Sequence, residues 1–139
     1  MRTLFADAHY WVALLNPRDQ WHRAARRAAA EYASARLVTT DAVLVEVLNF
    51  FSAFRTEMRQ ATAATVQEVL DDDRIDVVPC SHGTFMDGLE FYVARSDKSY
   101  SMVDCMSMQV MRNRDLNDVL THDHHFEQEG FNTLLQPFR

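Results

Sequence analysis

The chain has 139 residues, of which 47% are hydrophobic and 24% charged, a composition of ordinary globular domains that excludes disorder and fibrous structure as main interpretations. No apolar run approaches the roughly 20 residues of a membrane span, and no signal-peptide pattern opens the chain. The net charge of −6 argues against a protein that binds nucleic acid through its overall electrostatic field. We therefore expect a single domain over residues 1–139, in the cytoplasm and without a membrane partner.

Hydrophobic patterns along the chain predict strands that alternate with helices. Runs rich in β-branched and aromatic residues predict strands at Thr3–Asp7, Arg36–Thr40, Ile75–Pro79, Asp118–Thr121 and Thr133–Leu135. Helix formers predict the intervening helices at Tyr10–Leu15, Trp21–Ala35, Asp41–Phe54, Gln60–Leu70, His82–Ala94 and Ser101–Asn113. This alternation indicates a parallel sheet covered on both faces. The predicted fold class is α/β, a three-layer αβα arrangement with a central, mostly parallel five-stranded sheet.

Several common enzyme motifs are missing from the sequence. Gly83, Gly88 and Gly130 form no phosphate-cradling pattern, which excludes P-loop NTPases and NAD enzymes. No G-x-S-x-G elbow occurs, and the apolar, acidic neighbours of Cys105 disfavour its thiolate. Any catalysis must therefore use other side chains.

Four carboxylates lie far apart in the sequence, in settings that solvation explains poorly. Asp7 in LFADAHYW and Asp123 in VLTHDHHF lie at the ends of strand-like runs. Glu46 in AVLVEVLNFF and Asp104 in YSMVDCMSM lie in helix-patterned apolar segments. Ligands of open parallel sheets bind beyond the carboxyl ends of the strands, where Asp7 and Asp123 are expected. A compact fold can therefore bring these four carboxylates, which we call the acid quartet, into one cavity.

Such a cluster calls for a cation. Two carboxylates about 5 Å apart repel each other by roughly 3 kcal/mol at an effective dielectric near 20. They either become protonated or are neutralised by a hard divalent ion that prefers oxygen ligands. Mg²⁺ or Mn²⁺ in such a site can hold a phosphodiester and lower the pKa of a water molecule. The leading hypothesis is therefore a metal site for phosphate chemistry.

Glu46 is the strongest single signal in the quartet. Apolar residues surround it on nearly every helical face, which predicts a helix that is buried all round. A buried glutamate needs a partner, either a metal ion or a nearby arginine. Asn49 shares the face of Glu46 and can hydrogen-bond this carboxylate or a substrate.

Each of the three aspartates also has a purely structural interpretation. Ser101 and Asp104 fit the capping-box pattern at the start of a helix. Asp7 and Asp123 can cap the segments that follow them, which is the commonest role of an aspartate at such a place.

The histidines His122, His124 and His125 beside Asp123 raise the alternative of a zinc site. Neighbouring histidines at the end of a strand mostly diverge, so a solvated loop is the favoured interpretation of this segment.

Taken together, these segments resemble the PIN-domain family, and most of all the VapC toxin ribonucleases of VapBC toxin–antitoxin pairs. The resemblance spans essentially the whole chain. It depends on the aspartate after the first strand, the helix entry from Thr40 to Glu46, the segment DKSYSMVDCMSMQVM from Asp97 to Met111, and THDHHF followed by EGF near the end.

The resemblance implies functional residues and partners. Asp7, Glu46, Asp104 and Asp123 would bind one or two Mg²⁺ or Mn²⁺ ions. Thr121 matches a hydroxyl position near that site, and Asp97 matches an acid of this branch that is not a direct ligand. The family fold is a five-stranded parallel sheet between helical layers, and the implied partners are RNA, a cognate antitoxin protein and a second copy of the chain.

The resulting hypothesis is a metal-dependent endoribonuclease toxin that hydrolyses RNA phosphodiester bonds with a metal-activated water. Bases of a single-stranded or looped RNA can stack on Tyr10, Trp11 or Tyr100, although core packing is the favoured role of these aromatic residues. The alternatives are a noncatalytic RNA-binding or protein-interaction module and a phosphomonoester hydrolase, the latter lacking an aspartyl nucleophile motif and a phosphate-binding lysine.

Overall fold

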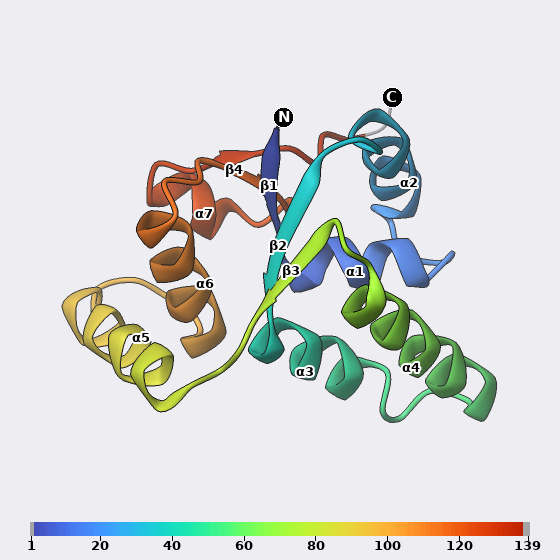
Figure 1. The fold of residues 1–139 in the computed structure, drawn as a ribbon, viewed down its shortest axis with the longest axis horizontal. Helices are drawn as coiled ribbons and strands as arrows, with labels where there is room; N and C mark the ends of the chain where they lie inside the picture. The colour runs from blue at the N-terminus through green and yellow to red at the C-terminus, as the bar shows by residue number, and fades with distance from the viewer. Residues whose placement is uncertain (1, 138–139) are drawn as a thin grey trace.

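A computed structural model describes residues 2–137, which form the five strands and seven helices drawn in Figure 1. The strands are β1 (Thr3–Ala6), β2 (Arg36–Thr40), β3 (Ile75–Val78), β4 (Asp118–Leu120) and β5 (Asn132–Thr133). The helices are α1 (Ala8–Leu15), α2 (His22–Glu31), α3 (Asp41–Phe50), α4 (Thr56–Asp71), α5 (His82–Ala94), α6 (Met102–Asn113) and α7 (His124–Gln128).

The strands form one sheet in the order β3-β2-β1-β4-β5, and every pair of neighbours is parallel. In the central strand β1, Phe5 pairs with Val38 of β2 on one side and with Val119 of β4 on the other. The chain moves outward from β1 through β2 to β3 and then crosses to β4 on the other side of β1. The strand order therefore reverses between β1 and β4, and a crevice at their carboxyl ends is the expected ligand site.

Helices cover the sheet on both sides. In Figure 1, α1, α2 and α4 lie on one side of the strands, and α5 and α6 lie on the other. Leu4, Phe5 and Ala6 of β1 have no exposed surface, as expected for a parallel strand with both faces covered. The predicted α/β fold with a five-stranded parallel sheet between helical layers is confirmed.

The helices predicted at Trp21–Ala35 and Asp41–Phe54 end earlier, at Glu31 and Phe50, and α4 begins at Thr56 and not at Gln60. Other differences lie near the end of the chain. The segment His124–Gln128 forms α7, where a loop was expected. Five residues with a single buried apolar member, Phe126, are too few to show helical periodicity. The last strand is Asn132–Thr133 and not Thr133–Leu135.

Helix α3 is not buried all round, so that prediction is wrong. Val43 and Val47 face the core, but Val45 is 54% exposed and Phe50 is 50% exposed. Composition alone does not reveal which side of a helix meets another element, because that depends on packing with distant segments. Glu46 lies at the boundary and is half-buried.

The longest helix, α4, has 16 residues. Within residues 2–137, no helix combines the length and apolar character that crossing a membrane requires.

Candidate active site

A cavity of about 490 Å³ lies beyond the carboxyl ends of β1 and β4. Glu46 of α3, Asp104 of α6 and Asp123 line it, together with residues of α1 and of the segment before α2. Asp7 is only 1% exposed and does not line the cavity. It is hydrogen-bonded to His9, which does line the cavity. Segments far apart in sequence therefore bring the acid quartet to one place.

Asp7 follows β1 directly and is the N-cap residue of α1, but its side chain makes no capping hydrogen bond. Its Oδ2 accepts a hydrogen bond of 2.9 Å from the buried Thr121 hydroxyl and lies 2.8 Å from His9 Nδ1. Thr121 Oγ1 in turn accepts the backbone N–H of Asp123 at 3.1 Å. Thr121 thus joins the carboxyl end of β1 to the loop after β4.

Asp104 lies in the first turn of α6 and closes the predicted capping box with Ser101. The Asp104 N–H donates to Ser101 Oγ at 3.0 Å, and the Ser101 N–H donates to Asp104 Oδ2 at 3.1 Å. Only 6% of Asp104 is exposed, and this exposed part lines the cavity. The structural and the functional interpretation are therefore compatible, because the cap holds this carboxylate at the cavity wall.

Asp123 caps α7 by accepting the backbone N–H of His125 at 2.9 Å. This first turn directs the imidazole of His125 toward the acids, with Nδ1 at 3.4 Å from Asp104 Oδ2 and 3.4 Å from Asp123 Oδ1. One donor atom from each of Asp104, Asp123 and His125 lies within 4.8 Å of the other two, a spacing that one metal ion can span.

The sequence patterns did not point to His125 or His9 as site residues. The expectation that the histidines diverge is correct for His122, whose ring stacks on Trp21 at 4.4 Å, and for the exposed His124. It fails for His125 because this residue belongs to a helix and not to a strand end. Asp123 was already a candidate cap in the sequence, and placing a short helix after it would have turned His125 toward the acids.

The pKa values of Glu46, Asp104 and His9 show the effect of crowding carboxylates into one cavity without a cation. Burial, and then the charges of Asp7 and Asp104, raise the pKa of Glu46 to about 7. Burial and the neighbouring Asp7 also raise the pKa of Asp104. The hydrogen bond to Asp7 raises the pKa of His9 to about 9. Glu46 and Asp104 therefore hold protons more tightly than isolated carboxylates do, which is expected of a pocket that favours positive charge.

Two predicted supporting residues lie away from this cavity. The side chain of Asp97 is 75% exposed and its charged partner is Lys98 at 4.0 Å. Asn49 is exposed on α3 and does not line the cavity. Thr121 is the one supporting residue that directly contacts a member of the quartet.

The aromatic residues proposed for base stacking are buried, with 4% of Tyr10, 5% of Trp11 and 5% of Tyr100 exposed. Their favoured role in core packing is therefore the correct one. The cavity wall has a different aromatic pair, Trp21 and His122, whose rings are nearly coplanar at 5°.

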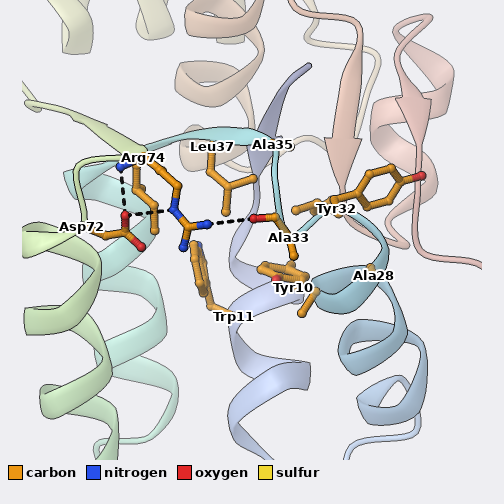
Figure 2. A pocket seen from close by; sticks show the side chains of 12 residues that line it. Tyr10, Trp11, Ala28, Tyr32, Ala33, Ala35, Leu37, Asp72 and Arg74 are labelled. Carbon is orange, nitrogen blue, oxygen red and sulfur yellow. Dashed lines mark hydrogen bonds and ion pairs between the residues drawn. The ribbon is translucent and has the colours of Figure 1, made fainter. Parts of the chain in front are cut away.

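A second cavity, of about 260 Å³, lies between α1, α2 and the start of β3 (Figure 2). Arg74 on its wall donates to the carbonyl of Ala33 at 2.8 Å and is paired with Asp72 at 3.5 Å. Trp11 and Tyr10 supply much of the remaining wall. Because its one acid already has an arginine partner, this cavity lacks the charge pattern of the first.

The residues around the first cavity fit a divalent cation. Carboxylate oxygens are the ligands that Mg²⁺ and Mn²⁺ favour, and three side chains of the acid quartet line the same space. His125 adds a buried Nδ1 atom that has no hydrogen-bond partner among residues 2–137. A cation would satisfy this atom and reduce the repulsion between the acids at the same time.

A carboxylate-lined cavity at the carboxyl edge of a parallel sheet defines this chain as an α/β domain with an acidic site suited to a divalent metal. Residues 4–132 match the family model of the PIN domain, and the chain belongs to that family. This confirms the resemblance inferred from the sequence.

Relatives and solved structures agree with this assignment. The chain is 28% identical over 128 residues to the 23S rRNA-specific endonuclease VapC20 of Mycobacterium tuberculosis. This match covers 92% of the chain and 95% of the relative. The crystal structure of that VapC20, described as a Sarcin-Ricin loop cleaving toxin, has a TM-score of 0.83 at 24% identity over 96% of this chain and 99% of that one. DNA-bound VapBC from Salmonella typhimurium has a TM-score of 0.65 at 15% identity, covering 96% and 97% of the two chains.

Proposed function

We propose that this protein is a divalent-metal-dependent endoribonuclease that acts as the toxin of a toxin–antitoxin pair. The observation that carries the proposal is the convergence of Asp104, Asp123 and His125 within 4.8 Å in a carboxylate-lined cavity of a PIN domain. The similarity to VapC20, which is named as an endonuclease specific for 23S rRNA, supports RNA as the substrate class.

In this proposal Asp7, Glu46, Asp104 and Asp123 hold Mg²⁺ or Mn²⁺. When bound, the ion neutralises the carboxylates, polarises a phosphodiester oxygen and makes a water molecule more acidic. Thr121 orients Asp7 through its hydrogen bond, and the capping box orients Asp104. An oxygen of Asp123 that does not hold the ion takes the proton of the attacking water.

The aromatic lining of the site favours an unpaired RNA segment. Trp21 and His122 line the same cavity as the acids, and aromatic rings stack on nucleobases that are not already stacked in a duplex. With a net charge of −6, the protein is suited to a few local contacts and not to a long phosphate track. We therefore propose a loop as the substrate.

The first test is the chemistry of the cleaved ends. Purified protein with Mn²⁺ and an RNA hairpin carrying a sarcin-ricin loop should release fragments with 5′-phosphate and 3′-hydroxyl ends, because water and not the 2′-hydroxyl attacks phosphorus. EDTA should abolish cleavage, and Asp104→Asn should reduce its rate at least about 100-fold. Asn keeps the capping hydrogen bond, so circular dichroism should remain unchanged.

The matched control for that assay is Asp71→Asn, which changes an exposed carboxylate at the end of α4 and should cleave at the normal rate. Fragments that end in a 2′,3′-cyclic phosphate would contradict the proposed mechanism. Equal cleavage by wild type and Asp104→Asn would instead favour a noncatalytic module with a contaminating nuclease.

We also propose a cognate antitoxin and a second copy of the chain as protein partners. Helix α5 exposes Phe85, Met86, Leu89, Tyr92 and Val93, and the end of α3 with the turn after it exposes Leu48, Phe50 and Phe54. Apolar surfaces of this kind usually mark interaction sites. Structural neighbours that are VapBC assemblies support such contacts.

Light scattering of the isolated protein should give the mass of two chains, and a monomer at all concentrations would contradict the homodimer.

A further inference from the structure

The Nδ1 atom of His125 has an unusual environment. It is buried and has no hydrogen-bond partner in the part of the chain that the structure describes, although two carboxylate oxygens lie 3.4 Å away. Buried polar atoms in folded proteins are nearly always paired. A nitrogen held between Asp104 and Asp123 without a hydrogen bond is placed to share a partner that binds nitrogen and oxygen together.

We propose that His125 Nδ1 is a direct ligand of the metal ion, together with Asp104 and Asp123, and that the site therefore selects Mn²⁺ over Mg²⁺. This inference rests on the proposed function only in taking the cavity to be a metal site. It adds a nitrogen ligand to what the acid quartet alone would make an all-oxygen site.

The distances agree with one shared ion. With bonds of about 2.1 Å, adjacent ligands of an octahedral ion lie roughly 3.0 Å apart and opposite ligands roughly 4.2 Å apart. His125 Nδ1 lies 3.4 Å from each carboxylate oxygen, and all three donor atoms fit within 4.8 Å. Small side-chain movements are sufficient to bring the three atoms around an ion.

The chain holds the imidazole in this orientation from two directions. The Asp123 cap fixes the first turn of α7 through the His125 N–H. On the other side the Tyr100 ring lies 5.4 Å from the His125 ring, and the Tyr100 hydroxyl donates to Glu129 at 3.2 Å. The capped backbone and the neighbouring ring restrict the orientation of the imidazole before an ion arrives.

A nitrogen ligand changes which metal is preferred. Mg²⁺ selects oxygen ligands and retains its waters, whereas imidazole suits later first-row metals, and Mn²⁺ accepts both nitrogen and oxygen. Replacing His125 should therefore weaken Mn²⁺ binding more than Mg²⁺ binding. The other explanation of the geometry is a protonated His125 that pairs with both acids and binds no metal.

Pulsed EPR of the Mn²⁺-loaded protein separates these two explanations, because a directly bound imidazole gives ¹⁴N couplings to the Mn²⁺ electron spin. We expect these couplings in the wild type and in the control His124→Ala, whose ring is exposed on the same helix. We expect their loss in His125→Ala and in His125→Gln, the second of which preserves polar side-chain volume. Calorimetry should show Mn²⁺ affinity reduced at least about tenfold in both His125 variants, with Mg²⁺ affinity changed much less.

Each possible result has a distinct meaning. Bound Mn²⁺ without ¹⁴N couplings in the wild type would overturn this inference and leave the proposed nuclease function intact. Couplings that persist in both His125 variants but vanish in His9→Ala would also overturn it, since the nitrogen would then come from the histidine beside Asp7. Failure of the wild type to bind Mn²⁺ at all would contradict the proposed function as well.

Discussion

Asp7→Asn is expected to bind Mn²⁺ at least about 100-fold more weakly than the wild type and to lose RNA cleavage by a similar or larger factor. Asp7 is the most buried member of the acid quartet, with 1% of its surface exposed. Its charge contributes to the raised pKa of both Glu46 and Asp104, so it adds to the negative potential of the cavity. Asn removes that charge but still accepts the Thr121 hydrogen bond.

Calorimetric titration of metal-free protein with Mn²⁺ measures this effect, and Asp71→Asn serves again as the control that should bind normally. Wild-type affinity should itself rise about tenfold between about pH 6 and about pH 8. The proton on Glu46 competes with the metal below its pKa of about 7, whereas a carboxylate at the ordinary value of 4.5 would impose no such dependence in this range. Unchanged Mn²⁺ affinity in Asp7→Asn would place the metal elsewhere.

Glu129→Ala is expected to lower the free energy of unfolding by about 3 kcal/mol and the melting temperature by about 10 °C. Only 7% of the Glu129 side chain is exposed, and it accepts hydrogen bonds from Arg95 at 2.6 Å, Arg112 at 3.0 Å and Tyr100 at 3.2 Å. These partners hold the pKa of Glu129 below its ordinary value, although burial acts in the opposite direction. Removing the carboxylate deprives Arg95 and Arg112 of the acid with which both are paired.

Thermal unfolding in EDTA measures this loss without a contribution from metal binding. Glu90→Ala is the matched control, because Glu90 is exposed on α5, and it should change the melting temperature by less than about 2 °C. If Glu129→Ala is as stable as this control, the arginines obtain equivalent interactions from water and the cluster does not stabilise the fold. Because Tyr100 links Glu129 to His125, we also expect weaker Mn²⁺ binding in this variant.

Several features of the fold are encoded in short stretches of sequence. The strands β1, β2 and β3 were predicted almost to their observed ends, because β-branched and aromatic runs between turn residues identify strands locally. The Ser101–Asp104 capping box was likewise predicted, since both of its hydrogen bonds join residues three positions apart. Such features need no information about distant parts of the chain.

Other features depend on contacts that no local pattern reveals. Glu46 lies in a segment apolar on all sides, yet Val45 and Phe50 beside it are exposed because no other element of the described chain covers that side of α3. His125 looked like part of a solvated loop until the helical turn capped by Asp123 directed its ring toward Asp104. Asp97 fits the family pattern but remains exposed beside Lys98.

By itself, the sequence determined the α/β class, the parallel sheet and the presence of acids at the ends of β1 and β4, because these properties follow from hydrophobic periodicity and from the direction of strands in alternating βα units. Only the tertiary structure decided which side chains meet in the cavity and that His9 and His125 are among them. Those distances are set by how β1, β4, α6 and α7 pack together, and packing between segments more than a hundred residues apart leaves no periodic trace in a single sequence.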